Sequence, residues 1–170
     1  MKKNNTKCLV LSALFAAIIT VCTRFTAIPI FGGQGYVHIG DAFVFLSAAI
    51  LPTPYAMATS AIGGGLADMM AGYTVYILPT AVIKALMALM FFRKSQSTKL
   101  LSSKSIISTV LGTLVLVGGY YIAEVILFGS FVSPLLGMVW NAFQGIFSSI
   151  AFLLLATAFD KSRLRERLSI

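Results

Sequence analysis

Six apolar stretches follow one another along the chain and are separated by short polar or turn-rich segments. All but the second approach the roughly 20 residues that a helix needs to cross a bilayer. Proline and glycine mark several boundaries: Pro29 follows the first stretch, Pro52 ends the second and Gly72 ends the third. The pattern predicts six transmembrane helices, at about 8–28, 39–51, 55–71, 74–92, 106–128 and 135–159.

The composition excludes an ordinary soluble domain. Of the 170 residues, 58% are hydrophobic and 11% are charged, whereas soluble domains carry about 25% charged residues. Six spans and their loops leave no room for a separate soluble domain. We therefore expect an all-α integral membrane protein whose residues 1–170 form a single six-helix membrane domain.

The basic residues indicate the topology. The net charge is +8, and eleven of the 13 basic residues fall into three groups, three at the N-terminus, four after the fourth span and four at the C-terminus. With six spans these groups share one side, which the positive-inside rule identifies as cytoplasmic. We thus expect both termini in the cytoplasm and no basic patch for nucleic acid. The groups are Lys2, Lys3, Lys7; Arg93, Lys94, Lys99, Lys104; and Lys161, Arg163, Arg165, Arg167.

The first apolar stretch follows a lysine-rich start, a pattern that also fits a signal peptide. We favour a retained first helix because every later stretch is equally apolar. Cys8 and Cys22 would lie about 21 Å apart on that helix at 1.5 Å per residue. This separation is too large for a disulfide, so we expect both cysteines to be packing residues.

Five ionisable residues lie within the apolar stretches or at their ends. A charged side chain near a helix centre costs about 2.5 to 3.5 kcal/mol, so it tends to face the bundle interior, form a pair or line a pathway. The predicted topology places all five, together with Asn141 and Gln144, in the outer half of the membrane and leaves the inner half apolar. It predicts a pocket open to the outside rather than a continuous pore. The five are Arg24, Asp41, Asp68, Lys84 and Glu124.

Helical spacing groups these side chains on shared faces. Residues three or four positions apart lie on one face of a helix, so four stripes are expected to face one site. An alternative is that small residues merely pack the helices and polar residues bond across them. The stripes are Tyr76, Thr80, Lys84 and Ala88; Ser60, Gly64, Asp68 and Gly72; Tyr120 and Glu124; and Gly137, Asn141, Gln144 and Ser148.

The polar candidates have different expected roles. Glu124 and Asn141 have no obvious basic partner at their level and are expected to contact a ligand hydroxyl or ring nitrogen. Asp68 and Lys84 either bind the ligand or neutralise each other as an ion pair between neighbouring helices. The sequence leaves that choice open.

Aromatic and loop residues complete the candidate site. Tyr76, Tyr120 and Trp140 are expected to stack on a flat ring, while Tyr36, Tyr73 and Tyr121 fit an interfacial belt. Asp41 lies near the outer end of the second span. His38, which precedes that span, either makes a loop hydrogen bond or acts as a titrating gate.

Enzyme motifs are missing from the sequence. It contains no Gly-x-Ser-x-Gly elbow, no His-Glu-x-x-His, no Walker A loop and only one histidine. We expect a protein that is not an enzyme, holds no metal or other cofactor and obtains energy for uphill transport from elsewhere.

Four segments resemble a known family. GYVHIGDA at 35–42, AIGGGLADMMAGY at 61–73, and YILPT and IKAL at 76–80 and 83–86 are similar to the substrate-binding S components of energy-coupling-factor (ECF) vitamin transporters. The resemblance covers the whole chain and is most specific from 35 to 86. It implies a substrate-binding subunit of a bacterial plasma-membrane importer, with an outward-facing vitamin site under the outer loops.

The resemblance also implies partners, namely a coupling membrane subunit and two ATPase subunits. Members carry Ala-x-x-x-Ala in the first helix as the docking face, which corresponds here to Ala13 and Ala17 with Ala16 between them. Ser12, Ala16 and Thr20 are expected to widen this face, because small residues four apart let helices approach closely.

The substrate is less determined. An acidic pocket favours a neutral or protonated heteroaromatic ring with hydroxyls, which suggests a hydroxymethylpyrimidine or pyridoxine type of ligand, with riboflavin next. Three rival functions stay open: a stand-alone secondary transporter or channel, which needs a continuous polar path; an intramembrane enzyme, which needs a catalytic group; and a purely structural subunit, which leaves the embedded acids unexplained.

Overall fold

The computed structural model describes residues 5–30, 35–91 and 99–162. The described chain is almost entirely helical, which confirms the expected all-α class, and each helix lies within a few residues of a predicted span. The helices are α1 (Asn5–Phe25), α2 (Asp41–Ile50), α3 (Thr53–Ala71), α4 (Ile77–Leu89), α5 (Ser103–Phe128) and α6 (Leu135–Lys161), with a 3-10 turn η1 (Thr74–Tyr76) before α4.

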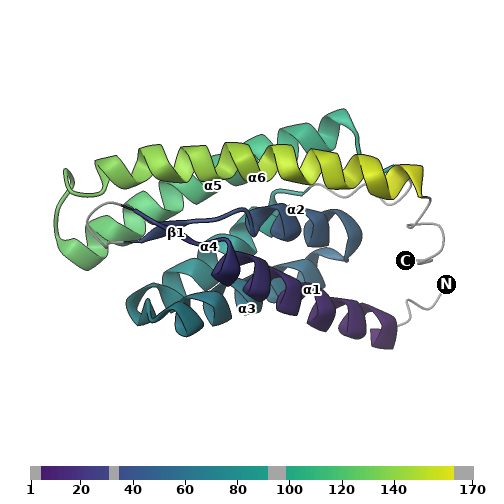
Figure 1. The fold of residues 1–170 in the computed structure, drawn as a ribbon, viewed down its shortest axis with the longest axis horizontal. Coiled ribbons are helices and arrows are strands. Elements are labelled where there is room, and N and C mark those ends of the chain that lie inside the picture. The colour runs from purple at the N-terminus through teal and green to yellow at the C-terminus, as the bar shows by residue number, and fades with distance from the viewer. Residues whose placement is uncertain (1–4, 31–34, 92–98, 163–170) are drawn as a thin grey trace.

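Three of these helices, α1, α5 and α6, are long and apolar enough to cross a membrane, while α2 and the η1–α4 segment are shorter apolar helices. Six crossings therefore stay a prediction. Helix α1 begins and α6 ends at the same end of the molecule (Figure 1), as an even number of crossings requires. Which side of the membrane this end faces is also a prediction, and basic residues 2, 3, 93, 94, 163, 165 and 167 lie outside the described residues.

The helices pack in three layers. Helices α5 and α6 lie together along one side and α1 and α3 along the other (Figure 1). The short helices α2 and α4 lie between them, since α2 packs on α1, α3 and α6, and α4 packs on α3 and α5. The short helices thus contribute residues to the interior, whereas α5 and α6 keep broad apolar faces on the outside.

Local sequence explains where the helices begin and end. The Ser102 hydroxyl accepts a hydrogen bond from the Ser105 backbone N–H at the start of α5. Gly72 and Gly129 follow α3 and α5 with φ of 83° and 64°, a left-handed conformation that glycine adopts without steric cost. These caps turn the chain sharply at the end of the molecule where the polar residues gather.

A cluster of aromatic rings fills the bundle at the C-terminal end of α4, away from the polar residues. The ring of Phe91 lies 5.6 Å from those of Phe45 and Phe152, and Phe45 and Phe152 lie 6.1 Å apart. Leu116 and Met87 pack in the same core and are fully buried. We call this cluster the aromatic core.

A short β-hairpin between α1 and α2 was not predicted. Strands β1 (Ile28–Pro29) and β2 (Tyr36–Val37) pair antiparallel, with Ile28 opposite Val37 and Pro29 opposite Tyr36. The turn-rich sequence between α1 and α2 predicts only a loop, because two-residue strands leave no periodicity to detect. The hairpin carries Tyr36 and leads directly to His38.

Candidate substrate-binding site

A cavity lies between the hairpin and α3, α4, α5 and α6, with about 830 Å³ of atom-free space including its mouth. Eight of the ten predicted site residues line it, which brings together side chains from four helices and a loop. They are His38, Asp68, Tyr76, Lys84, Tyr120, Glu124, Asn141 and Gln144, joined by Thr23, Ile30, Gly35, Tyr36, Gly64, Tyr73, Thr80, Ser133, Leu136 and Gly137.

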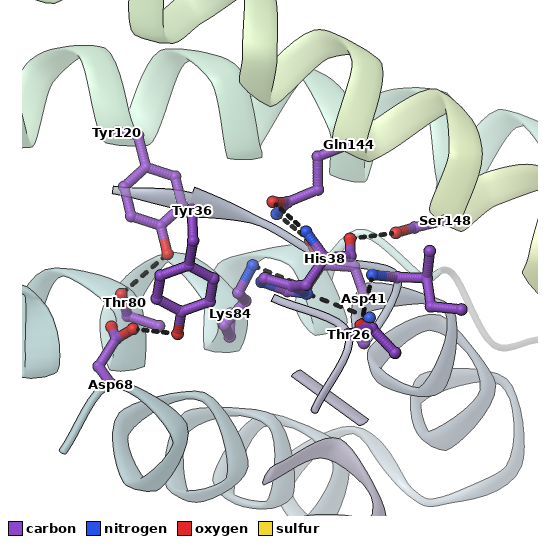
Figure 2. Close-up of polar contacts among 12 residues, drawn as sticks. Thr26, Tyr36, His38, Asp41, Asp68, Thr80, Lys84, Tyr120, Gln144 and Ser148 are labelled. Carbon is purple, nitrogen blue, oxygen red and sulfur yellow. Dashed lines mark hydrogen bonds and ion pairs between the residues drawn. The ribbon is translucent and has the colours of Figure 1, made fainter. Parts of the chain in front are cut away.

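The floor of the cavity is a buried ion pair. Lys84 Nζ lies 2.6 Å from Asp41 Oδ1, with the two side chains 1% and 0% exposed (Figure 2). Lys84 Nζ also lies 5.5 Å from the centre of the Tyr120 ring, within cation–π range. The alternative that Lys84 pairs with Asp68 is therefore wrong. Helical spacing identified the correct faces, but it does not tell which neighbouring helix supplies the partner.

Asp41 links the floor to α6 rather than lining the cavity. Gln144 Nε2 donates a 2.8 Å hydrogen bond to Asp41 Oδ2, and Gln144 Oε1 accepts one from the His38 backbone N–H at 3.2 Å (Figure 2). The Ser148 hydroxyl donates to the His38 carbonyl at 3.4 Å. Asp41 was expected among the ligand contacts, and the structure places it beneath them, where it neutralises Lys84.

The structure favours the loop hydrogen bond for His38 over the titrating gate. His38 Nδ1 accepts a 3.1 Å hydrogen bond from the Gly40 backbone N–H, and the side chain is 7% exposed. Burial lowers the pKa of His38 to about 4, against the smaller opposing effect of Asp41. The imidazole is therefore neutral at pH 7.

Two side-chain hydrogen bonds form one wall. The Tyr36 hydroxyl donates to Asp68 Oδ1 at 2.6 Å, and the Thr80 and Tyr120 hydroxyls lie 2.8 Å apart (Figure 2). Asp68 is thus held by the hairpin and not by a cation. This contact also connects the hairpin to α3, so it fixes the position of Tyr36 over the cavity.

Glu124 of α5 and Asn141 of α6 also line the cavity. The Tyr76 hydroxyl donates to Glu124 Oε1 at 3.5 Å, a long hydrogen bond. Within the described residues, no lysine or arginine forms an ion pair with Glu124. Asn141 is 9% exposed and borders the cavity. Both side chains lie where the sequence analysis expected ligand contacts.

Four tyrosines follow one another around the cavity, and two of them were missed. Ring centres are separated by 5.2 Å for Tyr36 and Tyr73, 6.3 Å for Tyr73 and Tyr76, and 6.4 Å for Tyr76 and Tyr120. Tyr36 and Tyr73 had been assigned to the interfacial belt. For Tyr73 the three-residue spacing to Tyr76 was an available signal, whereas Tyr36 depends on the unpredicted hairpin.

Trp140 does not border the cavity, contrary to expectation. Its ring lies 6.2 Å from Phe143, and the side chain is half-buried on the outer side of α6. Asn141 and Gln144 face inward on that helix, and Trp140 is rotated by about 100° from Asn141 as its direct neighbour. Trp140 is therefore on a different face of α6 from Asn141 and Gln144.

The proposed docking face on α1 is only partly exposed. Ala13 and Ala17 are exposed, as a docking role requires. Ala16 is 8% exposed and packs on α3, and the Thr20 hydroxyl donates to the Gly63 carbonyl at 3.0 Å. The expectation that Ala16 and Thr20 widen the docking face is wrong, because positions 16 and 20 lie on the face that contacts α3.

The cavity presents aromatic rings and hydrogen-bonding groups that can contact a ligand. Within residues 5–30, 35–91 and 99–162, no three His, Cys or acidic side chains gather as a metal site. Tyrosine rings offer stacking surfaces, and carboxylate and amide oxygens accept hydrogen bonds. The arrangement can hold a flat ring that carries N–H or O–H groups.

A family model, a sequence relative and a solved structure match this chain. Residues 3–161 match the model of the ECF-type riboflavin transporter S component. A Pyrococcus woesei protein described as an uncharacterized protein in a gap 3′ region is 32% identical over 113 residues, 65% of this chain and 74% of the relative. A solved structure of the S component of a bacterial ECF transporter superposes with a TM-score of 0.72 at 19% identity, covering 93% of this chain and 98% of that one.

Proposed function

The chain belongs to the family of ECF-type riboflavin transporter S components, and from this premise we propose that riboflavin is the molecule that it captures. As a member, it is a substrate-binding subunit of an ECF transporter. The family's description supports riboflavin over the hydroxymethylpyrimidine and pyridoxine ligands that the acidic pocket suggested.

The observation that carries this proposal is the tyrosine-lined cavity. Four tyrosine rings, those of Tyr36, Tyr73, Tyr76 and Tyr120, border the cavity. Aromatic rings stack in offset or tilted arrangements at centre distances of about 4.5 to 7 Å. A tricyclic ring with a hydroxylated chain would use both the rings and the hydrogen-bonding groups of Asp68, Glu124 and Asn141.

The position of the aromatic core supports a binding subunit rather than a channel. The cavity residues gather at one end of α4, whereas Met87 and Phe91 pack in the core toward the other end. A channel would require a polar path through this core. The apolar packing there favours a site that loads from a single side.

We extend the proposal to the membrane arrangement and the partners. The six helices would cross the plasma membrane with both termini in the cytoplasm and the cavity facing outward. A coupling membrane subunit and two ATPase subunits would supply the energy. Exposed Ala13 and Ala17 on α1 support docking at that helix, because alanines four apart let a partner helix approach closely.

Ligand binding tests the substrate directly. The full chain is purified in detergent micelles and titrated into riboflavin, whose fluorescence is expected to be quenched when the ring stacks on tyrosine. Pyridoxine and hydroxymethylpyrimidine serve as competitors. Saturable quenching that neither competitor reverses supports riboflavin, whereas binding of a competitor alone would reassign the substrate.

Docking is tested with larger side chains on α1. Ala13→Leu and Ala17→Leu are expected to abolish riboflavin uptake by cells while riboflavin binding by the purified subunit is unchanged. Ala158→Leu, at an exposed alanine of α6, is the matched control and should leave uptake intact. Loss of binding together with uptake would contradict a docking role that is separate from the site.

A further inference from the structure

The Glu124 carboxylate, on α5, lies beside Gly137 of α6. A Cβ atom placed on Gly137 would lie 3.0 Å from Glu124 Oε2 and 3.7 Å from Glu124 Cδ. A contact of 3.0 Å is tighter than ordinary van der Waals packing, so the carboxylate occupies space that any other residue at 137 would take. Both residues border the cavity.

Nothing in the backbone demands glycine at position 137. Among the described residues, the glycines with positive φ are Gly72 and Gly129, and Gly137 lies within α6, where alanine is more favourable than glycine. Its neighbour in space is the end of a side chain and not another helix backbone. Helix packing therefore does not require this glycine either.

We propose that Gly137 is a positioning residue for substrate specificity: its missing side chain holds open the space in which the Glu124 carboxylate faces the ligand. The proposal rests on the proposed function, in which Glu124 accepts a hydrogen bond from the vitamin. The Tyr76 hydroxyl at 3.5 Å is a weak restraint on Glu124, so the open space at Gly137 matters for where the carboxylate rests.

Gly137→Ala is the direct test. The methyl group displaces the flexible end of Glu124 more readily than it displaces α6, so we expect riboflavin affinity to fall about 5- to 10-fold. The melting temperature should be unchanged or higher because alanine stabilises the helix. Gly118→Ala on α5 is the matched control, since a Cβ there meets no atom within 4 Å, and it should bind riboflavin like the wild type.

A double variant separates displacement of Glu124 from direct obstruction of the ligand. In the Glu124→Ala background there is no carboxylate to displace, so adding Gly137→Ala should cost less than about twofold in affinity. If the methyl group simply blocks riboflavin, Gly137→Ala will cost as much in this background as in the wild type, and the proposal is overturned.

A second readout needs no ligand. The chain has five acidic residues, so the infrared band of the Glu124 carboxyl group can be assigned by its loss in Glu124→Gln. Gly137→Ala should shift this band and Gly118→Ala should not; an unshifted band overturns the proposal. If the wild type fails to bind riboflavin, the vitamin assignment falls while the infrared result still decides the role of Gly137.

Discussion

The two ends of α4 show a division within the bundle. Toward the hairpin, Tyr76, Thr80 and Lys84 face the cavity and make side-chain contacts with α2 and α5. Toward the other end, Met87 and Phe91 pack in the aromatic core, where the neighbouring rings belong to α2 and α6. A single short helix thus contributes to a polar site and to an apolar core.

The comparison suggests that stability and binding can be changed separately. Buried polar groups contribute little net stability once their desolvation is counted, whereas a tightly packed ring loses many contacts when truncated. The aromatic core should therefore dominate unfolding, and the cavity residues should dominate affinity. Asp41 and Lys84, at the boundary between the two, should affect both.

The largest effect on stability is expected at the aromatic core. Phe152→Ala removes a fully buried ring that contacts Phe45 and Phe91 and should lower the free energy of unfolding by about 3 to 5 kcal/mol. Thermal unfolding in detergent measures it. Riboflavin affinity, determined well below the melting temperature, should stay within about twofold of the wild type; a larger loss would break the separation.

The boundary pair should show a mixed effect. Asp41→Asn leaves the Lys84 charge without its partner and should cost about 3 kcal/mol of stability, the lower part of the usual range because Lys84 borders the open cavity. Affinity should fall as well, since Gln144 loses its carboxylate acceptor. The double variant with Lys84→Met should recover most of the stability, and no recovery would contradict the ion pair.

The cavity wall should control affinity alone. Glu124→Gln replaces the carboxylate acceptor by a neutral amide, and Asn141→Ala removes a hydrogen-bonding side chain; each should weaken riboflavin binding by about 5- to 150-fold. Their melting temperatures should match the wild type because neither side chain supports the aromatic core. Titration calorimetry and thermal unfolding on the same samples separate the effects. Unchanged affinity in both variants would place the site on other helices.

The smallest effect is expected where the hairpin meets α3. Tyr36→Phe removes the 2.6 Å hydrogen bond to Asp68 and should cost about 1 kcal/mol of stability, measured by thermal unfolding. Asp68→Asn should not be rescued by Lys84→Met, because Lys84 pairs with Asp41. If Lys84→Met did rescue Asp68→Asn, the result would support an ion pair between Asp68 and Lys84 and would contradict the structure.

The sequence predicted the helices well because apolar length and glycine or proline boundaries are local properties. Eight of the ten candidate site residues line the cavity, since depth in the membrane and helical spacing both restrict where polar groups can face. These two quantities do not fix how each helix is rotated about its axis. For this reason Trp140 and Ala16 were placed on the wrong faces.

Contacts between segments far apart in the sequence were harder to predict. The partner of Lys84 depends on α2 lying beside α4, and the role of Tyr36 depends on a hairpin of two-residue strands. Neither arrangement leaves a periodic signal. The sequence raised an ion pair of Lys84 with Asp68 as one of two alternatives, and the packing of the helices pairs Lys84 with Asp41 instead.

A structure of the full chain with riboflavin bound is the most direct test of the account. We predict that the ring lies among Tyr36, Tyr73, Tyr76 and Tyr120, with a ligand hydroxyl or ring nitrogen within hydrogen-bonding distance of Glu124. The aromatic core should be unchanged. Riboflavin bound outside this cavity, or an empty cavity at saturating riboflavin, would contradict the central claim that the polar end of the bundle is the substrate site.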